Sequence, residues 1–149
     1  MDLIDNIVRA YDKGQATALI LLDFSKAFDT LNHDLLIAKC HYFGFSPTAC
    51  QFISTYLKNR TQRVRLGNKM SDTKNIPSGV PQGSILGPLL FLLYTADLSN
   101  VLTTCQSQFY ADDTQLYHHF KPQASASAAR TLTTDLNAVA QFCDQHGLI

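Results

Sequence analysis

Two adjacent aspartates, Asp112 and Asp113, stand between two short segments that both favour strand structure. Residues 107–111 and 114–120 are rich in Tyr, Phe and Leu, which predicts a β-hairpin with the two carboxylates at its tight turn. Neighbouring anions repel each other unless a cation lies between them, and Mg2+ prefers carboxylate oxygens that leave room for water and phosphate. The pattern predicts a metal site, although an acidic pair is equally compatible with ordinary turn chemistry.

Length and composition indicate a globular protein around this hairpin. The chain has 149 residues, of which 46% are hydrophobic and 16% charged. One domain that buries roughly 70% of its unfolded surface is therefore expected. The net charge is zero, so the total charge indicates no particular partner, but half of the basic residues fall within residues 58–74, where Asp72 is the only acid. They are Lys58, Arg60, Arg63, Arg65, Lys69 and Lys74.

The cysteines and the first residues favour an intracellular protein, in the nucleus or the cytoplasm, that is not secreted. The cysteines are widely spaced and have no His at ligand spacing, which is typical of reduced core thiols. Asp2 and Asp5 stand where a signal peptide would have basic residues. The longest charge-free stretch, residues 75–96, contains three prolines, and its apolar part is shorter than the roughly 20 residues that span a bilayer. No membrane partner is expected. The cysteines are Cys40, Cys50, Cys105 and Cys143.

A continuous apolar run leads to another aspartate. Residues 17–24 are apolar at both alternating positions, which predicts a central strand covered on both faces. Asp23 lies near the end of this run, and a carboxylate buried there without a partner would be costly. Asp23 is therefore expected to need a cation or a cluster of donors, unless it caps the segment that follows.

Helices are predicted where apolar residues recur three and four positions apart between capping residues. Asn32 and Ser46 are the expected N-caps of the second and third helices, and Pro88 is tolerated only in the first turn or at a kink of the fourth. The predicted helices cover residues 2–12, 33–43, 47–57, 85–98 and 125–147. The last is expected to pack on the sheet through Ala129, Leu132, Leu136, Val139 and Cys143.

Two further segments carry candidate binding residues. Residues 62–66 alternate in polarity before a Gly-Asn turn, which predicts a strand with Arg63 and Arg65 on one face. Two such arginines can bind phosphates, although a solvated sheet face is equally expected. Residues 77–88 hold three prolines and three glycines. This density predicts either an irregular backbone that a ligand approaches closely or a structural loop that caps the next helix.

Three motifs, in order, resemble those of a known family. They are LLDFSKAFD at 21–29, SGVPQGSILGPLLF at 78–91 and FYADDTQLY at 109–117, and they are similar to the A, B and C motifs of reverse transcriptases. Their sequences resemble those of the LINE-type, non-LTR retrotransposon branch, jockey-like elements among them. The resemblance covers essentially the whole chain. It implies an α+β fold with residues 1–149 as a partial reverse transcriptase domain: a palm whose small antiparallel sheet, with a ferredoxin-like core, is backed by helices.

The resemblance also implies a metal site. Asp23 and Asp112 would be the main ligands of two Mg2+ ions, for which Mn2+ can substitute. The main-chain carbonyl of Phe24 would assist them, and Asp113 matches the third carboxylate of the family.

Further residues match positions that contact substrates in the family. Tyr110 would lie near the primer end, and the ring of Phe28 would crowd the sugar 2'-position and so select deoxynucleotides. Gln82 and Gly83 match the loop that shapes the nucleotide pocket. Arg63 and Arg65 have no secure motif match, so a nucleic-acid role for them rests on charge alone.

The implied activity is RNA-directed DNA synthesis from deoxynucleoside triphosphates on an RNA template and a DNA primer. Two metals about 3.5 to 4 Å apart can activate a primer 3'-hydroxyl and stabilise the leaving pyrophosphate. An aspartic-protease dyad needs two carboxylates that share a proton, which adjacent aspartates on one turn do not suit. The chain is expected to lack most of the fingers and all of the thumb. The alternatives are therefore a truncated, inactive palm remnant that at most binds nucleic acid, and an interaction domain derived from one.

Overall fold

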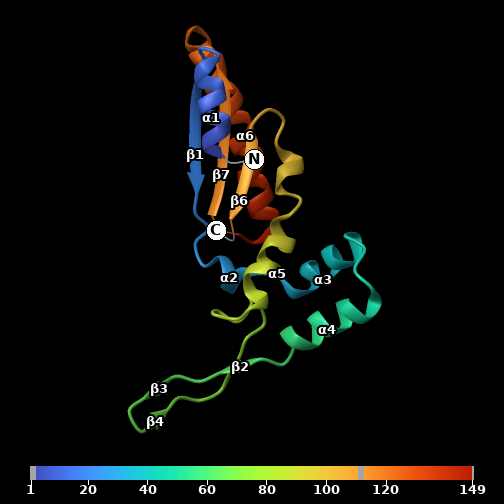
Figure 1. Ribbon diagram of the computed structural model, residues 1–149. Helices are drawn as coiled ribbons and strands as arrows, with labels where there is room; N and C mark the ends of the chain where they lie inside the picture. The colour runs from blue at the N-terminus through green and yellow to red at the C-terminus, as the bar shows by residue number, and fades with distance from the viewer. Residues whose placement is uncertain (1–2, 111–112, 149) are drawn as a thin grey trace. The chain divides into compact units, whose positions relative to one another are not determined.

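The computed structural model describes residues 3–110 and 113–148 (Figure 1). The chain divides into two compact units. The first consists of residues 1–25 and 95–149, so it joins two segments that are distant in sequence, and the second consists of residues 26–94.

A three-stranded antiparallel sheet forms the centre of the first unit. Its strands are β1 (Ala16–Leu22), β6 (Gln106–Tyr110) and β7 (Asp113–Phe120), in the order β1-β7-β6. The β1–β7 register runs from Ala16 opposite Phe120 to Leu22 opposite Thr114. The small antiparallel sheet and the hairpin expected from the sequence are thus both present.

The prediction that the apolar run at residues 17–24 is a central strand is wrong. β1 lies at one edge of the sheet, and its Leu19 and Leu21 side chains are 43% and 68% exposed. β7 has the central place, and both Leu116 and Tyr117, which point to opposite faces, are buried. An apolar run predicts a strand, but what covers that strand comes from segments distant in sequence.

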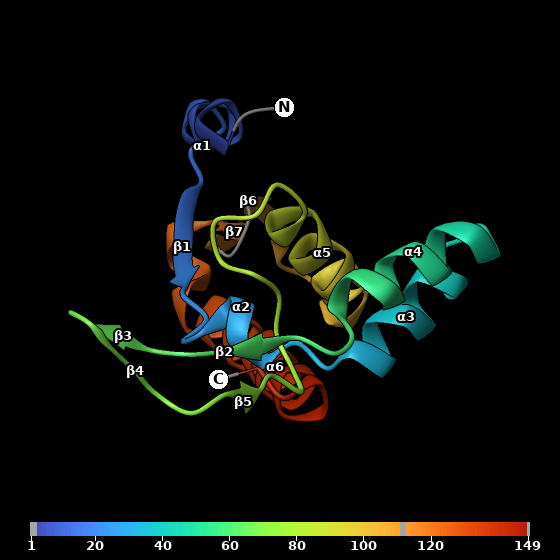
Figure 2. The same cartoon turned by 90° about the horizontal axis from the view of Figure 1, so that it is seen from below.

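Helices cover both faces of this sheet. Figures 1 and 2 show α1 (Leu3–Asp12) and α6 (Ser125–His146) on opposite sides of it. Asn6 of α1 donates a hydrogen bond from Nδ2 to the Tyr117 hydroxyl oxygen at 2.9 Å, which ties α1 to β7. Two short 3-10 helices, η1 (Leu98–Val101) and η2 (Pro122–Ala124), precede β6 and α6.

The buried face of α6 differs from the predicted one. Of the predicted inner residues only Val139 is buried, and Ala129 is exposed. The buried stripe is shifted by about one residue from the predicted one. It includes an aspartate, which a hydrophobic pattern assigns to the solvent side. It consists of Ala128, Asp135, Val139 and Phe142.

The second unit holds the remaining helices. Asn32 and Ser46 cap their helices as predicted, since Asn32 Oδ1 accepts from the Leu35 N–H and Ser46 Oγ accepts from the Ala49 N–H. The fourth predicted helix ends at Thr95 instead of residue 98, and Pro88 lies in its first turn. No described helix is both long and apolar enough to cross a membrane. The helices of this unit are α2 (Ala27–Thr30), α3 (His33–Tyr42), α4 (Pro47–Leu57) and α5 (Leu86–Thr95).

A long, thin hairpin follows α4 (Figure 1). Leu66 pairs with Lys69, so the Gly-Asn pair between them forms the predicted turn. The predicted continuous strand over residues 62–66 is wrong. The side chain of Ser71 accepts from the Val64 N–H and interrupts the ladder, and every residue from 61 to 75 is exposed. The hairpin consists of β2 (Thr61–Gln62), β3 (Arg65–Leu66), β4 (Lys69–Met70) and β5 (Lys74–Asn75), with β2 paired to β5 and β3 to β4.

Candidate functional site

Asp23, Asp113 and Tyr110 lie at the same end of the three-stranded sheet. Leu22 opposite Thr114 is the last pair of β1 and β7, and Asp23 and Asp113 are the next residues beyond that pair. Tyr110 is the partner of Asp113 across β6 and β7. All three side chains are exposed. The sheet register therefore brings residues from two of the three sequence motifs to one edge of the first unit.

The exposure of Asp23 corrects the expectation of a buried carboxylate. Because Asp23 is exposed, it carries no large desolvation penalty and needs no partner for stability. Phe24, the next residue, is buried. Asp113 is the first residue of β7 and pairs with Tyr110, the last residue of β6.

The carboxylates at this edge suit a hard divalent cation by the chemistry of their oxygen donors. Asp112, the other main predicted ligand, lies outside the described residues. Among residues 3–110 and 113–148, no group of three or more His, Cys, Asp or Glu side chains is placed to hold a metal ion. Asp23, Phe24 and Asp113 are thus the predicted ligands whose placement the structure gives.

A buried carboxylate that the sequence analysis missed holds the chain just before β6. Asp135 on α6 is fully buried and accepts a hydrogen bond from the Thr103 hydroxyl at 2.6 Å. It also accepts from the backbone N–H groups of Thr103 at 2.9 Å, Thr104 at 3.0 Å and Cys105 at 2.7 Å. Asp135 therefore anchors the start of β6 to α6.

The hydrogen bonds also decide the charge state of Asp135. Burial raises its pKa, but the bonds from Thr103, Thr104 and Cys105 stabilise the carboxylate and hold the pKa below its usual range. Burial, together with the hydrogen bond to Asp135 and its negative charge, raises the pKa of the Cys105 thiol to about 12. The signal available in the sequence was an aspartate four positions before Val139 on an otherwise apolar helix stripe.

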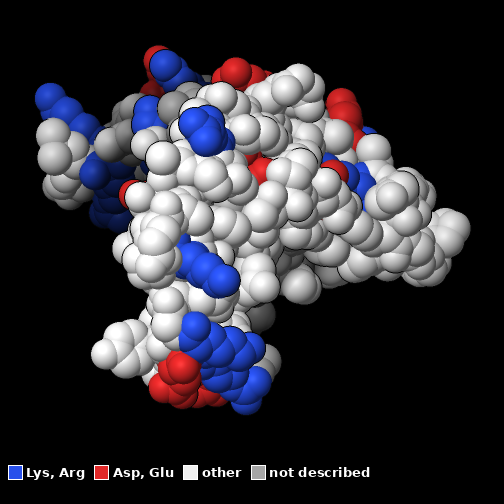
Figure 3. Space-filling view, turned by 90° about the horizontal axis from the view of Figure 1, so that it is seen from above, with Lys and Arg blue, Asp and Glu red and all other residues white. Residues whose placement is uncertain are grey.

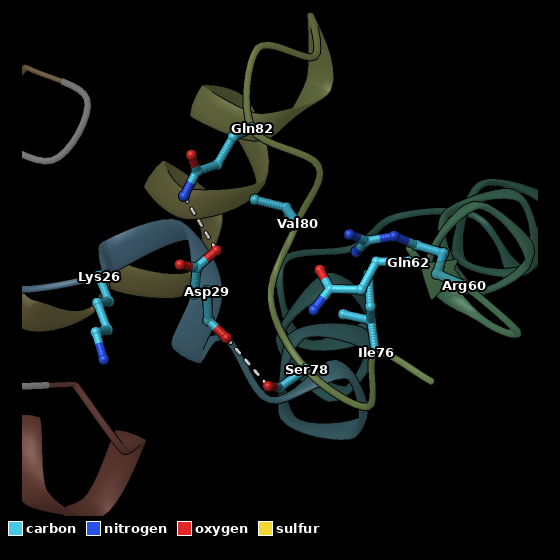
Figure 4. Close-up of a pocket in the computed structure, with 8 residues that line it drawn as sticks. All are labelled: Lys26, Asp29, Arg60, Gln62, Ile76, Ser78, Val80 and Gln82. Carbon is cyan, nitrogen blue, oxygen red and sulfur yellow. Dashed lines mark hydrogen bonds between the residues drawn. The ribbon is translucent and has the colours of Figure 1, made fainter. Parts of the chain in front are cut away.

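In the second unit, the loop that follows the hairpin includes Ser78, Gly79 and Gln82 and lies against α2. This loop borders a cavity of about 610 Å3 (Figure 4). Of the predicted nucleotide-binding residues, Gln82 lines this cavity. Phe28 is half-buried and packs against Phe91, with ring centroids 5.6 Å apart. Gly83 is exposed and has a φ of 74°. The lining residues are Lys26, Asp29, Arg60, Gln62, Ile76, Ser78, Val80 and Gln82.

The close contact between this loop and α2 requires a glycine at position 79. Gly79 has a φ of +75°, and a Cβ there would lie 2.6 Å from the Phe28 carbonyl oxygen and 2.7 Å from the Asp29 Cα. The Gly79 N–H donates to the Leu31 carbonyl at 2.8 Å. The Gly79 carbonyl accepts from His33 Nε2 and Arg60 Nη1, both at 2.8 Å. The irregular Pro- and Gly-rich backbone predicted from the sequence is therefore held in one conformation by specific contacts.

Arg63 and Arg65 do not form the predicted pair on one strand face, because only Arg65 belongs to a strand. Arg63 Nε donates to Thr73 Oγ1 at 2.5 Å, and Arg65 Nε donates to the Gly67 carbonyl at 3.1 Å. Both side chains are exposed on the hairpin. On the face drawn in Figure 3, Lys and Arg side chains reach the surface. The exposed hairpin carries Arg63, Arg65, Lys69 and Lys74, with Asp72 as the acid among residues 61–75.

The sequence as a whole is similar to those of RNA-directed DNA polymerases. A probable RNA-directed DNA polymerase from transposon BS of Drosophila melanogaster is 32% identical over 153 aligned positions, which cover 95% of this chain and 16% of that protein. The RNA-directed DNA polymerase from mobile element jockey of Drosophila funebris is 34% identical over 98 positions, covering 66% of this chain and 11% of that protein. A retrovirus-related Pol polyprotein from the type-1 retrotransposable element R2 of Popillia japonica is 29% identical over 86 positions, or 58% of this chain and 14% of that protein.

These alignments and a comparison with a family model indicate the same family. This chain spans 10 to 16% of the length of the curated relatives that it matches. The family model described as "Reverse transcriptase (RNA-dependent DNA polymerase)" matches residues 2–149. Because that match covers nearly the whole chain and the relatives come from jockey and other non-LTR elements, the chain belongs to the reverse transcriptase family and is jockey-like.

Proposed function

We propose that this chain forms the palm of an RNA-directed DNA polymerase of a non-LTR retrotransposon, which adds deoxynucleotides to a primer 3'-hydroxyl. The observation that carries the proposal is the position of Asp23 and Asp113 beside each other at one end of the antiparallel sheet. Family membership supports the reaction class. The substrates are an RNA template, a DNA primer and deoxynucleoside triphosphates.

The carboxylates at this sheet end are the proposed ligands of two Mg2+ ions, or of Mn2+ in their place. Asp23 and Asp113 supply exposed oxygen donors, which suits hard cations. Asp112 and the main-chain carbonyl of Phe24 complete the proposed ligand set. Such ions, when bound, activate the primer 3'-hydroxyl and stabilise the charge of the leaving pyrophosphate.

Further residues of each unit, taken by itself, are proposed to contact the substrates. Tyr110 is 80% exposed beside Asp113, so its ring is available to contact the primer end. The half-buried ring of Phe28 is backed by Phe91, which limits its movement and would help it exclude a 2'-hydroxyl. Gln82 and Gly83 would shape the nucleotide pocket.

The test is a chimeric polymerase. We expect that the jockey polymerase of Drosophila funebris, with this chain in place of its equivalent segment, synthesises DNA on an RNA template. Asp23→Ala and Asp112→Ala should each abolish extension because they remove metal ligands, whereas the exposed Asp144→Ala should not. Phe28→Ala should admit ribonucleotides more readily.

The alternative, a palm remnant that binds nucleic acid without catalysis, has a different outcome. A chimera that folds and binds primer–template but does not extend the primer would favour the remnant. Extension that survives Asp23→Ala would contradict the assigned site.

A further inference from the structure

We propose that Asp29 is a positioning residue that sets the orientation of the Gln82 side-chain amide, so that Gln82 offers its oxygen to a bound nucleotide as a hydrogen-bond acceptor. This inference rests on the proposed function, because the nucleotide is the substrate of that reaction. Asp29 has no part in the metal site or in the predicted nucleotide contacts described above.

Asp29 contacts the loop at two points (Figure 4). Its Oδ1 atom accepts from Gln82 Nε2 at 3.1 Å. Its main-chain carbonyl accepts from Ser78 Oγ at 3.0 Å. All three residues line the same cavity. Asp29 therefore joins α2 to the loop both at the start of the loop and at the glutamine.

The chemistry of the two side chains decides which way the amide faces. An ionised carboxylate has only acceptor atoms, whereas a glutamine amide has two N–H donors on one arm and an acceptor oxygen on the other. Only the nitrogen arm of Gln82 can therefore face Asp29, which places Oε1 on the opposite arm. A ligand that meets Gln82 on that arm must donate a hydrogen bond, as a sugar hydroxyl or a base amino group does.

The backbone beneath this pair does not depend on the Asp29 carboxylate. The Val80 N–H donates to the Phe28 carbonyl at 2.6 Å, and the Gly79 N–H donates to the Leu31 carbonyl. Both bonds join the loop to the α2 segment through main-chain atoms. Asp29→Asn keeps these bonds and the side-chain shape, but its own amide carries both a donor and an acceptor, so Gln82 can turn over. We therefore expect Asp29→Asn to change the orientation of the Gln82 side-chain amide and to leave the loop backbone in place.

Considered by charge alone, the loss of the Asp29 carboxylate should strengthen nucleotide binding. Lys26 and Arg60 line the cavity and attract an anionic ligand, whereas the Asp29 carboxylate repels one. Removal of the charge by Asp29→Asn should tighten the binding of a triphosphate unless the carboxylate has a positioning role. The sign of the change therefore separates the two effects.

A double-mutant cycle on the whole chain tests the proposal. The dissociation constant of dATP with Mg2+ would be measured by calorimetry for the wild type, Asp29→Asn, Gln82→Ala and the double variant. With Gln82 present, Asp29→Asn should weaken binding by about 2-fold relative to the same change without Gln82, because an amide that can turn over presents its oxygen to the ligand only about half of the time. In the Gln82→Ala background the same change should leave binding unchanged or tighten it. Equal effects in both backgrounds would overturn the proposal.

A second measurement needs no ligand. The 1H–15N resonance of the Gln82 side-chain amide, identified by its loss in Gln82→Ala, should shift in Asp29→Asn and not in Asp34→Asn, an exposed control on α3. An unchanged resonance in Asp29→Asn would overturn the positioning role. If the wild type binds no dATP, the proposed nucleotide site fails, whereas the shift of the amide resonance still supports the Asp29–Gln82 pair.

Discussion

At the scale of single residues, Asp135 links the stability of the first unit to pH. Its carboxylate accepts hydrogen bonds from the Thr103 hydroxyl and from the backbone N–H groups of Thr103, Thr104 and Cys105 while it is fully buried. Asp135→Asn keeps the volume but replaces one acceptor oxygen with a donor that faces other donors. We expect the free energy of unfolding to fall by about 2 to 4 kcal/mol, measured by urea denaturation. Asp144→Asn, an exposed change on the same helix, should be close to neutral.

The direction of the Asp135 pKa also predicts a pH dependence. The folded-state pKa lies below that of the unfolded chain, which is about 3.9. The stabilising contribution is therefore fully present above that unfolded-state value and is lost as the pH falls toward the folded-state pKa. The wild type should lose stability between about pH 5 and pH 2, and Asp135→Asn should lose less over the same range. Parallel pH profiles for the two proteins would contradict the assignment.

At the scale of elements, the β2–β5 hairpin is a local, exposed and basic surface. It includes Arg63 and Arg65, and both are accessible to phosphates. Binding to a primer–template should therefore be weak and should fall steeply with salt as counterions are released. Arg63→Ala with Arg65→Ala should lower affinity on every sequence alike and reduce the salt slope by about 2.

The matched control for this prediction removes two positive charges from another element. Arg9→Ala with Lys13→Ala changes the net charge equally, at and just beyond the end of α1. Fluorescence anisotropy over a series of salt concentrations would measure both variants. An equal loss of affinity in the two variants would show that only total charge matters, and salt-independent binding would contradict the hairpin interface.

At the scale of the whole molecule, ions bound by the proposed carboxylates should stabilise the folded chain by mass action. At a free Mn2+ concentration ten times the dissociation constant, the gain is about 1.4 kcal/mol, which thermal unfolding can detect. Asp23→Ala with Asp112→Ala should abolish the metal-dependent rise in melting temperature. The pair Asp34→Ala with Asp144→Ala, exposed positions elsewhere, should leave it intact. A rise that persists in the first double variant would remove the proposed site.

The elements that could be predicted from the sequence are those whose structure depends on residues a few positions apart in the chain. The caps at Asn32 and Ser46 lie within three residues of the N–H groups that they accept from. The Gly-Asn turn needs only its own two residues and their neighbours. The order of the three motifs was sufficient for family recognition, and the family model confirms it.

Tertiary structure alone decided which of these elements cover and contact one another. The apolar pattern of residues 17–24 predicts a strand, but its edge position depends on β6 and β7, about ninety residues further along the chain. Asp135 was not among the predicted inner residues of α6, and it is buried because hydrogen-bond donors some thirty residues away in sequence contact it. The Asp29–Gln82 pair joins residues 53 positions apart. Local propensity acts over a few residues, whereas the partners of a buried or hydrogen-bonded side chain are chosen by packing across the chain.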